Sequence, residues 1–387
     1  MLIRIDYKEK IQPDMVCAYD EGNIEGFRNL ITDGKNINCL NKNGQSIMTR
    51  VICNMPKHSQ ELNRQFFDEL LSNNFHLGKV SRYNEDYLSV AIRQHDEYYA
   101  EKLLEADIIL NCYQERTTDK YDKNFKNDVY YNHPIFSAIY GKKYDTILTI
   151  LNNKDFDVNI QTRIGLNILN YAIQYLPNEK LDEFFPLFLQ KGADINNISK
   201  NNRNCFHNLA IYSKNPKLFE IAYNCRVDVN LQDKYGNTPL FYMINNKNPM
   251  ADLILKNGAN PNIQNKKKQT PAMWAAAYKN TNFLRILEQH NADFTIQDKN
   301  GQNTAHYAAF RFFKNNLQEF MDVLKCQEDI FLAKDRYHNT PSDIVKSRKS
   351  HLFNIFNKLL KEERKTINSV KTSQKTTKKS AEKTYLL

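Results

Sequence analysis

The sequence predicts an all-α fold built from repeated helix-turn-helix units, and three observations support this. A pattern of turn, helix, break and second helix returns every 32 to 37 residues through the second half of the chain. Each period has room for two short helices, whose apolar residues one unit cannot bury alone. Hydrophobic residues make up 41% of the chain, which is enough for a continuous core between stacked units.

The clearest unit covers residues 233–262, and each of its parts has a physical reason. Asp233 and Gly236 suit a tight turn, because glycine adopts a positive φ without steric cost. Thr238 can cap the next helix, and the proline after it fits the first helical turn. Gly258 is expected to follow the second helix with a positive φ.

The same pattern starts again at Asn265 and at Asp298, and looser copies extend toward the N-terminus. Pairs of small residues such as Ala275-Ala276 allow neighbouring helices to pack closely. These residues resemble the ankyrin repeat, with its T-P-L opening, paired alanines and G-A-D or G-A-N ending. The resemblance implies an ankyrin-repeat solenoid of about nine or ten helix-turn-helix units with short hairpin tips.

We expect one elongated array over residues 1–362, with insertions near 54–63 and 111–132, where the spacing between units widens. Residues 363–387 form a basic tail rich in Ser and Thr, which we predict to be disordered. The last 30 residues hold nine Lys or Arg and three Glu, so the tail supplies much of the net charge of +10.

Cysteine usage and the first residues indicate a cytosolic protein. Seven cysteines without a CxxC pair argue against a disulfide or zinc scaffold. The segment 1–10 lacks the apolar core of a signal peptide, and no apolar run is long enough to span a bilayer. Secretion without a cleaved signal peptide, into a host cell, is compatible with these features.

Motifs for catalysis are missing, and we predict no enzyme, no cofactor and no metal site. The chain has no phosphate-binding glycine loop, no H-E-x-x-H and no serine nucleophile elbow. His133-Pro134 fits the repeat register and lacks the glycines of the nucleotide-transfer loop that it resembles. The ankyrin resemblance implies a structural role for His207 and His306. Three aromatic residues are expected in the core: Tyr242, Trp274 and Tyr307.

Aromatic and basic residues recur at two places in successive units. One place is the end of the first helix, and the other is the turn tip, where acidic residues are nearly absent. Tyr and Arg dominate binding hot spots, although AT-rich codons would also enrich Tyr and Lys. We predict these partner-binding residues: Tyr140, Tyr175, Tyr212, Lys234, Tyr235, Lys266, Lys267, Tyr278, Lys299, Phe310, Arg311 and Arg336.

The ankyrin resemblance implies a protein-protein interaction scaffold that holds a partner protein on its concave face. The basic tips favour an acidic partner, the composition is compatible with a partner of host origin, and we expect a monomer. AT-rich composition fits intracellular bacteria, some parasites and large DNA viruses. With the polar tail, it is similar to an ankyrin-repeat effector of an intracellular bacterium. Two alternatives remain open: a nucleic-acid-associated protein that uses the basic tail and tips, and an enzyme within residues 52–132.

Overall fold

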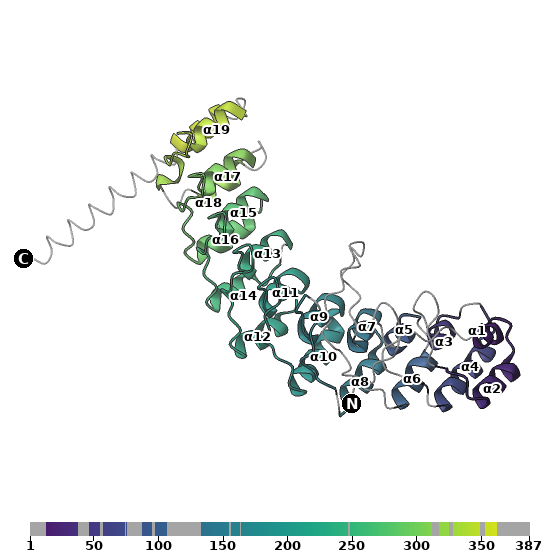
Figure 1. Cartoon of the computed structure of the whole chain (residues 1–387). Helices are drawn as coiled ribbons and strands as arrows, with labels where there is room; N and C mark the ends of the chain where they lie inside the picture. The colour runs from purple at the N-terminus through teal and green to yellow at the C-terminus, as the bar shows by residue number, and fades with distance from the viewer. Residues whose placement is uncertain are drawn as a thin grey trace, which may run out of the picture. The chain divides into compact units, whose positions relative to one another are not determined.

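The chain is helical in its described parts and divides into two compact units, Met1–Asn197 and Ile198–Leu387 (Figure 1). Within the described residues there is no β-strand, and no helix there is both long and apolar enough to span a bilayer. The computed structural model describes residues 13–37, 46–54, 57–73, 75, 87–94, 97–106, 133–154, 156–162, 164–246, 248–311, 317–324, 328–348 and 353–361.

The first unit consists of consecutive helix pairs. Each odd-numbered helix packs on the helix that follows it, and first helices of neighbouring pairs also pack together, as α5 does on α7. The helices are α1 (Pro13–Asp20), α2 (Ile24–Thr32), α3 (Ile47–Ile52), α4 (Gln60–Ser72), α5 (Tyr87–Arg93), α6 (Glu97–Glu105), α7 (Pro134–Gly141), α8 (Tyr144–Asn152), α9 (Ile168–Tyr175) and α10 (Asn178–Gln190).

The core of this unit is largely aromatic near its N-terminal end. The Tyr19 ring contacts the Phe66 ring edge to face at 5.0 Å, and Phe27 meets Phe66 in the same way at 5.0 Å. Tyr19 donates a hydrogen bond of 2.8 Å to the buried amide of Asn63. Asn63 in turn donates to the Tyr99 hydroxyl at 2.7 Å. One buried amide on α4 therefore links α1 and α6.

Residues 54–63, predicted to carry an insertion, contain the connection between α3 and α4 and the first turn of α4. Ser59 caps α4, because its hydroxyl accepts a hydrogen bond of 3.2 Å from the Leu62 N–H. The other predicted insertion, at 111–132, and the tail, 363–387, lie outside the described residues.

The second unit repeats the same pairing. Counted with residues 353–361 as the partner of α19, the described parts of both units hold ten helix pairs, in agreement with the predicted nine or ten units. The elements are α11 (Cys205–Tyr212), α12 (Pro216–Asn224), α13 (Pro239–Asn246), α14 (Ala251–Lys256), α15 (Pro271–Ala277), α16 (Thr281–Gln289), α17 (Thr304–Arg311), α18 (Leu317–Leu324), η1 (Glu328–Phe331) and α19 (Pro341–Arg348).

Asparagine caps join the start of a first helix to the segment that follows the second helix of the same pair, in both units. The side-chain oxygen of Asn204 accepts from the His207 N–H at 3.3 Å and caps α11, while its amide donates to the Asp228 carbonyl at 2.5 Å. Asn167 makes the same two kinds of contact in the first unit, and Asn303 makes them at α17. The amide thus satisfies a helix end and a carbonyl some 25 residues further along.

Candidate functional site

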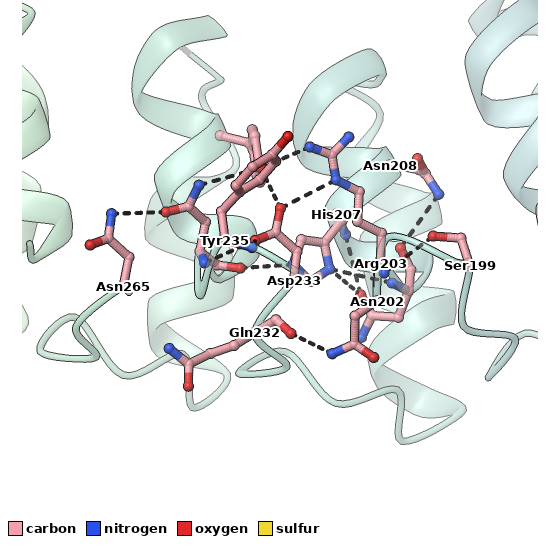
Figure 2. Close-up of polar contacts among 12 residues, drawn as sticks. Ser199, Asn202, Arg203, His207, Asn208, Gln232, Asp233, Tyr235 and Asn265 are labelled. Atoms are coloured by element: carbon pink, nitrogen blue, oxygen red, sulfur yellow. Dashed lines mark hydrogen bonds and ion pairs between the residues drawn. The ribbon is translucent and has the colours of Figure 1, made fainter. Parts of the chain in front are cut away.

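The turn tips of the second unit share one construction, seen best at Asp233 (Figure 2). The Asp233 carboxylate accepts hydrogen bonds from the backbone N–H groups of Tyr235, at 2.8 Å, and Asn237, at 3.0 Å. Gly236, with φ +79°, closes the turn by donating to the Asp233 carbonyl at 2.8 Å. The side chain of the first tip residue therefore holds the tip in one conformation.

Asp233 is buried and is shared between two repeats. The Arg203 guanidinium, from the preceding tip, lies 3.4 Å from its carboxylate and 4.7 Å from the centre of the Tyr242 ring. The Tyr242 hydroxyl donates to the same carboxylate at 2.5 Å. Burial raises the pKa of this tyrosine, so the hydroxyl keeps the proton that it donates. The charge of Asp233 is therefore neutralised and hydrogen-bonded within the structure.

Tyr242, Tyr307 and Trp274 are half-buried, which corrects their predicted place in the core. Tyr307 donates to the Asp298 carboxylate at 2.9 Å, and burial raises its pKa to about 12. Trp274 donates to the side chain of Gln269 at 3.0 Å. Their polar atoms need partners that an apolar core does not offer, so they lie beside the tips.

The two histidines have the structural role that the resemblance implies. Nδ1 of His207 accepts from the Asn204 N–H at 3.3 Å, and Nε2 lies 3.1 Å from the Asn237 carbonyl of the next repeat. His306 contacts Asn339 in the same way at 3.1 Å. Burial lowers the pKa of His207 to about 4. Among the described residues, no three His, Cys, Asp or Glu side chains are grouped to hold a metal.

The exposed aromatic residues at the ends of first helices come from both units. Tyr140, at the end of α7, is 50% exposed, and its ring lies 5.3 Å from the half-buried Tyr175 of α9. In the second unit Tyr212 ends α11 and Tyr278 follows α15, and they are 46% and 53% exposed. Of the tyrosines predicted at the ends of first helices, two therefore lie in each unit.

The remaining predicted residues all lie in the second unit. Phe310 is half-buried, because the Arg348 guanidinium of α19 lies 4.6 Å from its ring. Arg348 was not predicted, and no repeat signal marks it. The exposed residues are Arg311 at the end of α17 and, on the tips, Lys234, Tyr235, Lys266, Lys267, Lys299 and Arg336.

Comparisons with known proteins agree with this architecture. A family model described as ankyrin repeats in three copies matches residues 169–265 and 243–331. Inversin of Canis lupus familiaris is 29% identical over 124 residues, 31% of this chain. An ankyrin repeat protein of fowlpox virus is 30% identical over 123 residues, also 31% of the chain. One of Acanthamoeba polyphaga mimivirus is 23% identical over 291 residues, 73% of the chain.

The aligned segments span 11% of inversin, 27% of the fowlpox protein and 66% of the mimivirus protein. The family match covers the part of the chain where the turn, cap and paired-alanine pattern is clearest. The helix pairs, the capped first helices and the tips extend that pattern through the described residues. On these grounds the described residues have the fold of an ankyrin-repeat solenoid, and the match to the ankyrin-repeat family model itself covers residues 169–331.

Proposed function

We propose that this protein is a protein-protein interaction scaffold that holds a partner protein on the ends of its first helices and on its turn tips. The ankyrin repeats support a binding role, and the proposal assigns the protein no catalytic step. The observation that carries it is the exposure of a tyrosine near the end of a first helix in both units, at Tyr140, Tyr212 and Tyr278.

Exposed tyrosines suit a binding surface because a rigid ring provides contact area at a low cost in conformational entropy. Because Tyr212 is exposed, its replacement should lower the stability of the chain by at most about 0.5 kcal/mol. Its loss from the centre of an interface should cost about 2 kcal/mol of binding free energy.

A matched pair of variants tests this proposal. Tyr212 and Tyr223 belong to the same helix pair and are both 46% exposed, but Tyr223 lies on the second helix, α12. Cytosolic partners captured by the parent chain should be lost with Tyr212→Ala and retained with Tyr223→Ala. Equal retention by both variants would show that the ends of the first helices are not the binding surface.

Action inside a host cell extends the proposal. It is supported by the AT-rich composition, and two of the relatives described above come from viruses that infect animal or amoebal cells. One hypothesis of this kind is that the protein is an effector of an intracellular bacterium. A translocation reporter fused to the chain tests it. Transfer of the reporter into host cells by a bacterial secretion system supports it, and retention in the bacterium overturns it.

A nucleic-acid-associated role is the second candidate, and the exposed basic tips of the second unit favour it. Binding of this kind should fall steeply with salt, because each neutralised phosphate releases counterions. An acidic partner protein would bind the same cations. The two candidates are therefore distinguished by whether the charges of an acidic protein or those of a nucleic acid match the spacing of these cations.

A further inference from the structure

Five successive tips of the second unit carry a cation at the same position. In each tip the first residue is Ser, Asp or Asn, the second is basic, and the fourth has a positive φ between +58° and +79°. The side chains at the second position are all exposed. They are Lys200, Lys234, Lys266, Lys299 and Arg336, which together we call the tip row.

No carboxylate of the described residues forms an ion pair with the tip row. Contrary to the expectation from the sequence, three of these tips contain an acidic residue. These residues are Asp233, Asp298 and Asp335, and each is at most 7% exposed. Their carboxylates accept backbone N–H groups of their own tips, as Asp335 does from Tyr337 at 2.9 Å. At the third tip Asn265 replaces the aspartate and makes the same contacts without a charge. The exposed surface of these tips is therefore cationic, most of all at the third tip, where residues 266–268 are all lysine.

Backbone hydrogen bonds join each tip to the next. The N–H of Lys234 donates to the Asn201 carbonyl at 2.8 Å, and that of Lys266 donates to Tyr235 at 3.0 Å. Lys299 and Arg336 repeat this contact with the tips before them, at 3.3 and 2.9 Å. Side-chain amides add a second series of links, such as Asn202 to the Gln232 carbonyl (Figure 2). The backbone positions that carry the cations are thus joined in series before any partner binds.

We propose that the tip row binds an extended acidic segment of a partner protein, with a carboxylate at every third residue. Neighbouring helices pack about 8–10 Å apart, and the tips between them should repeat at that interval. A chain in the polyproline II conformation advances about 3.1 Å per residue with three residues per turn, so every third side chain faces the same way about 9 Å further on. The inference rests on the proposed scaffold function and names the chemistry of its partner.

The arrangement fits an acidic polypeptide better than a nucleic acid. Duplex DNA carries one charge per about 1.7 Å of its axis, far denser than one cation per tip. Single strands bind by stacking bases on free aromatic faces. The two exposed rings on these tips already face cations, since Lys234 lies 5.1 Å from the Tyr235 ring centre and Arg336 lies 4.7 Å from that of Tyr337.

The experiment uses the full chain and three fluorescent probes, with binding followed by anisotropy. One probe is a peptide with glutamate at every third position among neutral residues. The second has the same composition with the glutamates in one block, and the third is a single-stranded oligonucleotide of equal charge. The variants are Lys266→Glu with Lys299→Glu, and the control Lys214→Glu with Arg285→Glu. The control makes the same change in net charge at exposed positions away from the tips.

We expect the spaced peptide to bind the parent more tightly than the block peptide does. The tip variant should weaken it by at least about tenfold, because attraction at two tips becomes repulsion, and the control variant should change it by less than about twofold. Equal weakening by both variants, no preference for the spaced peptide, or tighter binding of the oligonucleotide would each overturn the inference. Capture of partners through Tyr212 would then still support the scaffold, so the two failures can be told apart.

Discussion

Two kinds of contact join neighbouring repeats within the described residues of the two units. In the first unit side chains on second helices join across pairs: Arg28 of α2 meets Glu69 of α4 at 2.5 Å, and Tyr98 of α6 donates to Asp68 of α4 at 2.7 Å. The second unit has such a contact too, between His290 at the end of α16 and Asp252 of α14 at 2.8 Å. Its described tips are also joined through their backbones, as the Lys266 N–H donates to the Tyr235 carbonyl at 3.0 Å.

This difference has a consequence for binding. A charge used in an ion pair between helices, such as Lys143 with Glu97 at 2.9 Å, is less available to a partner, and the lysine lowers the pKa of that carboxyl. Tips linked by their backbones leave the side chains at the second position exposed, as at Lys266. The second unit can therefore present a fixed row of cations.

The largest expected effect concerns the aromatic core of the first unit. Phe66→Ala removes a fully buried ring that contacts Tyr19 and Phe27, so it should lower the stability of this unit by about 3–5 kcal/mol. Hydrogen exchange should show lost protection in α1 to α6 and unchanged protection in α13 to α17. Equal loss in both units would mean that they unfold as one, against the division described here.

The second effect is a dependence on pH in the second unit. Burial lowers the pKa of His207 to about 4, against about 6.5 in an unfolded chain. The unfolded chain therefore binds more protons between these values. Stability from this group is complete above about pH 6.5 and falls by up to about 3 kcal/mol as the pH drops through 4. His306, whose pKa burial also lowers, acts in the same direction.

Urea unfolding of the second unit at about pH 7 and about pH 4.5 measures this loss. His207→Gln serves as the control, because it removes the titrating ring and should flatten the difference between the two pH values. A parent and a variant with the same pH dependence would show that His207 is not the source.

The third effect compares two glycines of the second unit. A Cβ at Gly236 would lie 2.6 Å from the backbone nitrogen of Lys266, whereas a Cβ at Gly258 would meet nothing within 4 Å. Both have a positive φ. Gly258→Ala should cost about 1 kcal/mol from backbone strain, and Gly236→Ala should cost about 2 kcal/mol or more because the next tip must move. Similar melting temperatures for the two variants would contradict the close contact between tips.

The smallest effect tests the asparagine links. Asn204→Thr keeps a capping oxygen but removes the amide that donates to Asp228, so it should cost about 1 kcal/mol. Asn23 in the first unit caps α2 by accepting from Gly26, and Asn23→Thr should cost only a few tenths of a kcal/mol. Chemical denaturation of both variants measures the difference, and equal costs would show that the bond from Asn204 to Asp228 adds nothing.

Much of the fold could be predicted because its signals are local. The positive φ at Gly258 was predicted from its place after a helix, and the roles of His207 and His306 were predicted from the ankyrin resemblance; the structure confirms them. The hydrogen bonds of the capping asparagines to the segment after the second helix were not predicted. Those bonds depend on a partner some 25 residues away, and no local pattern marks that partner.

The candidate site was predicted only in part, for a related reason. The sequence places Tyr175, Tyr212 and Phe310 alike at the ends of first helices, but it does not say that Tyr212 is exposed while the other two are half-buried. It also does not distinguish a cation that is neutralised, such as Arg203 beside Asp233, from one that is exposed, such as Lys234. The choice of partner-binding residues among them stays a prediction that the variants above test.

The sequence by itself determined the repeat, its period, its capped helices and its tight turns, because each of these depends on the φ preferences and hydrogen-bonding groups of neighbouring residues. Tertiary structure decided which charges remain available. In the sequence nothing distinguishes the tip aspartates from exposed ones. Folding buries the carboxylates of Asp233, Asp298 and Asp335 within the tips. The tip surface is positive because the buried carboxylates accept hydrogen bonds from backbone N–H groups and do not neutralise the exposed cations. These hydrogen bonds form only in the folded chain.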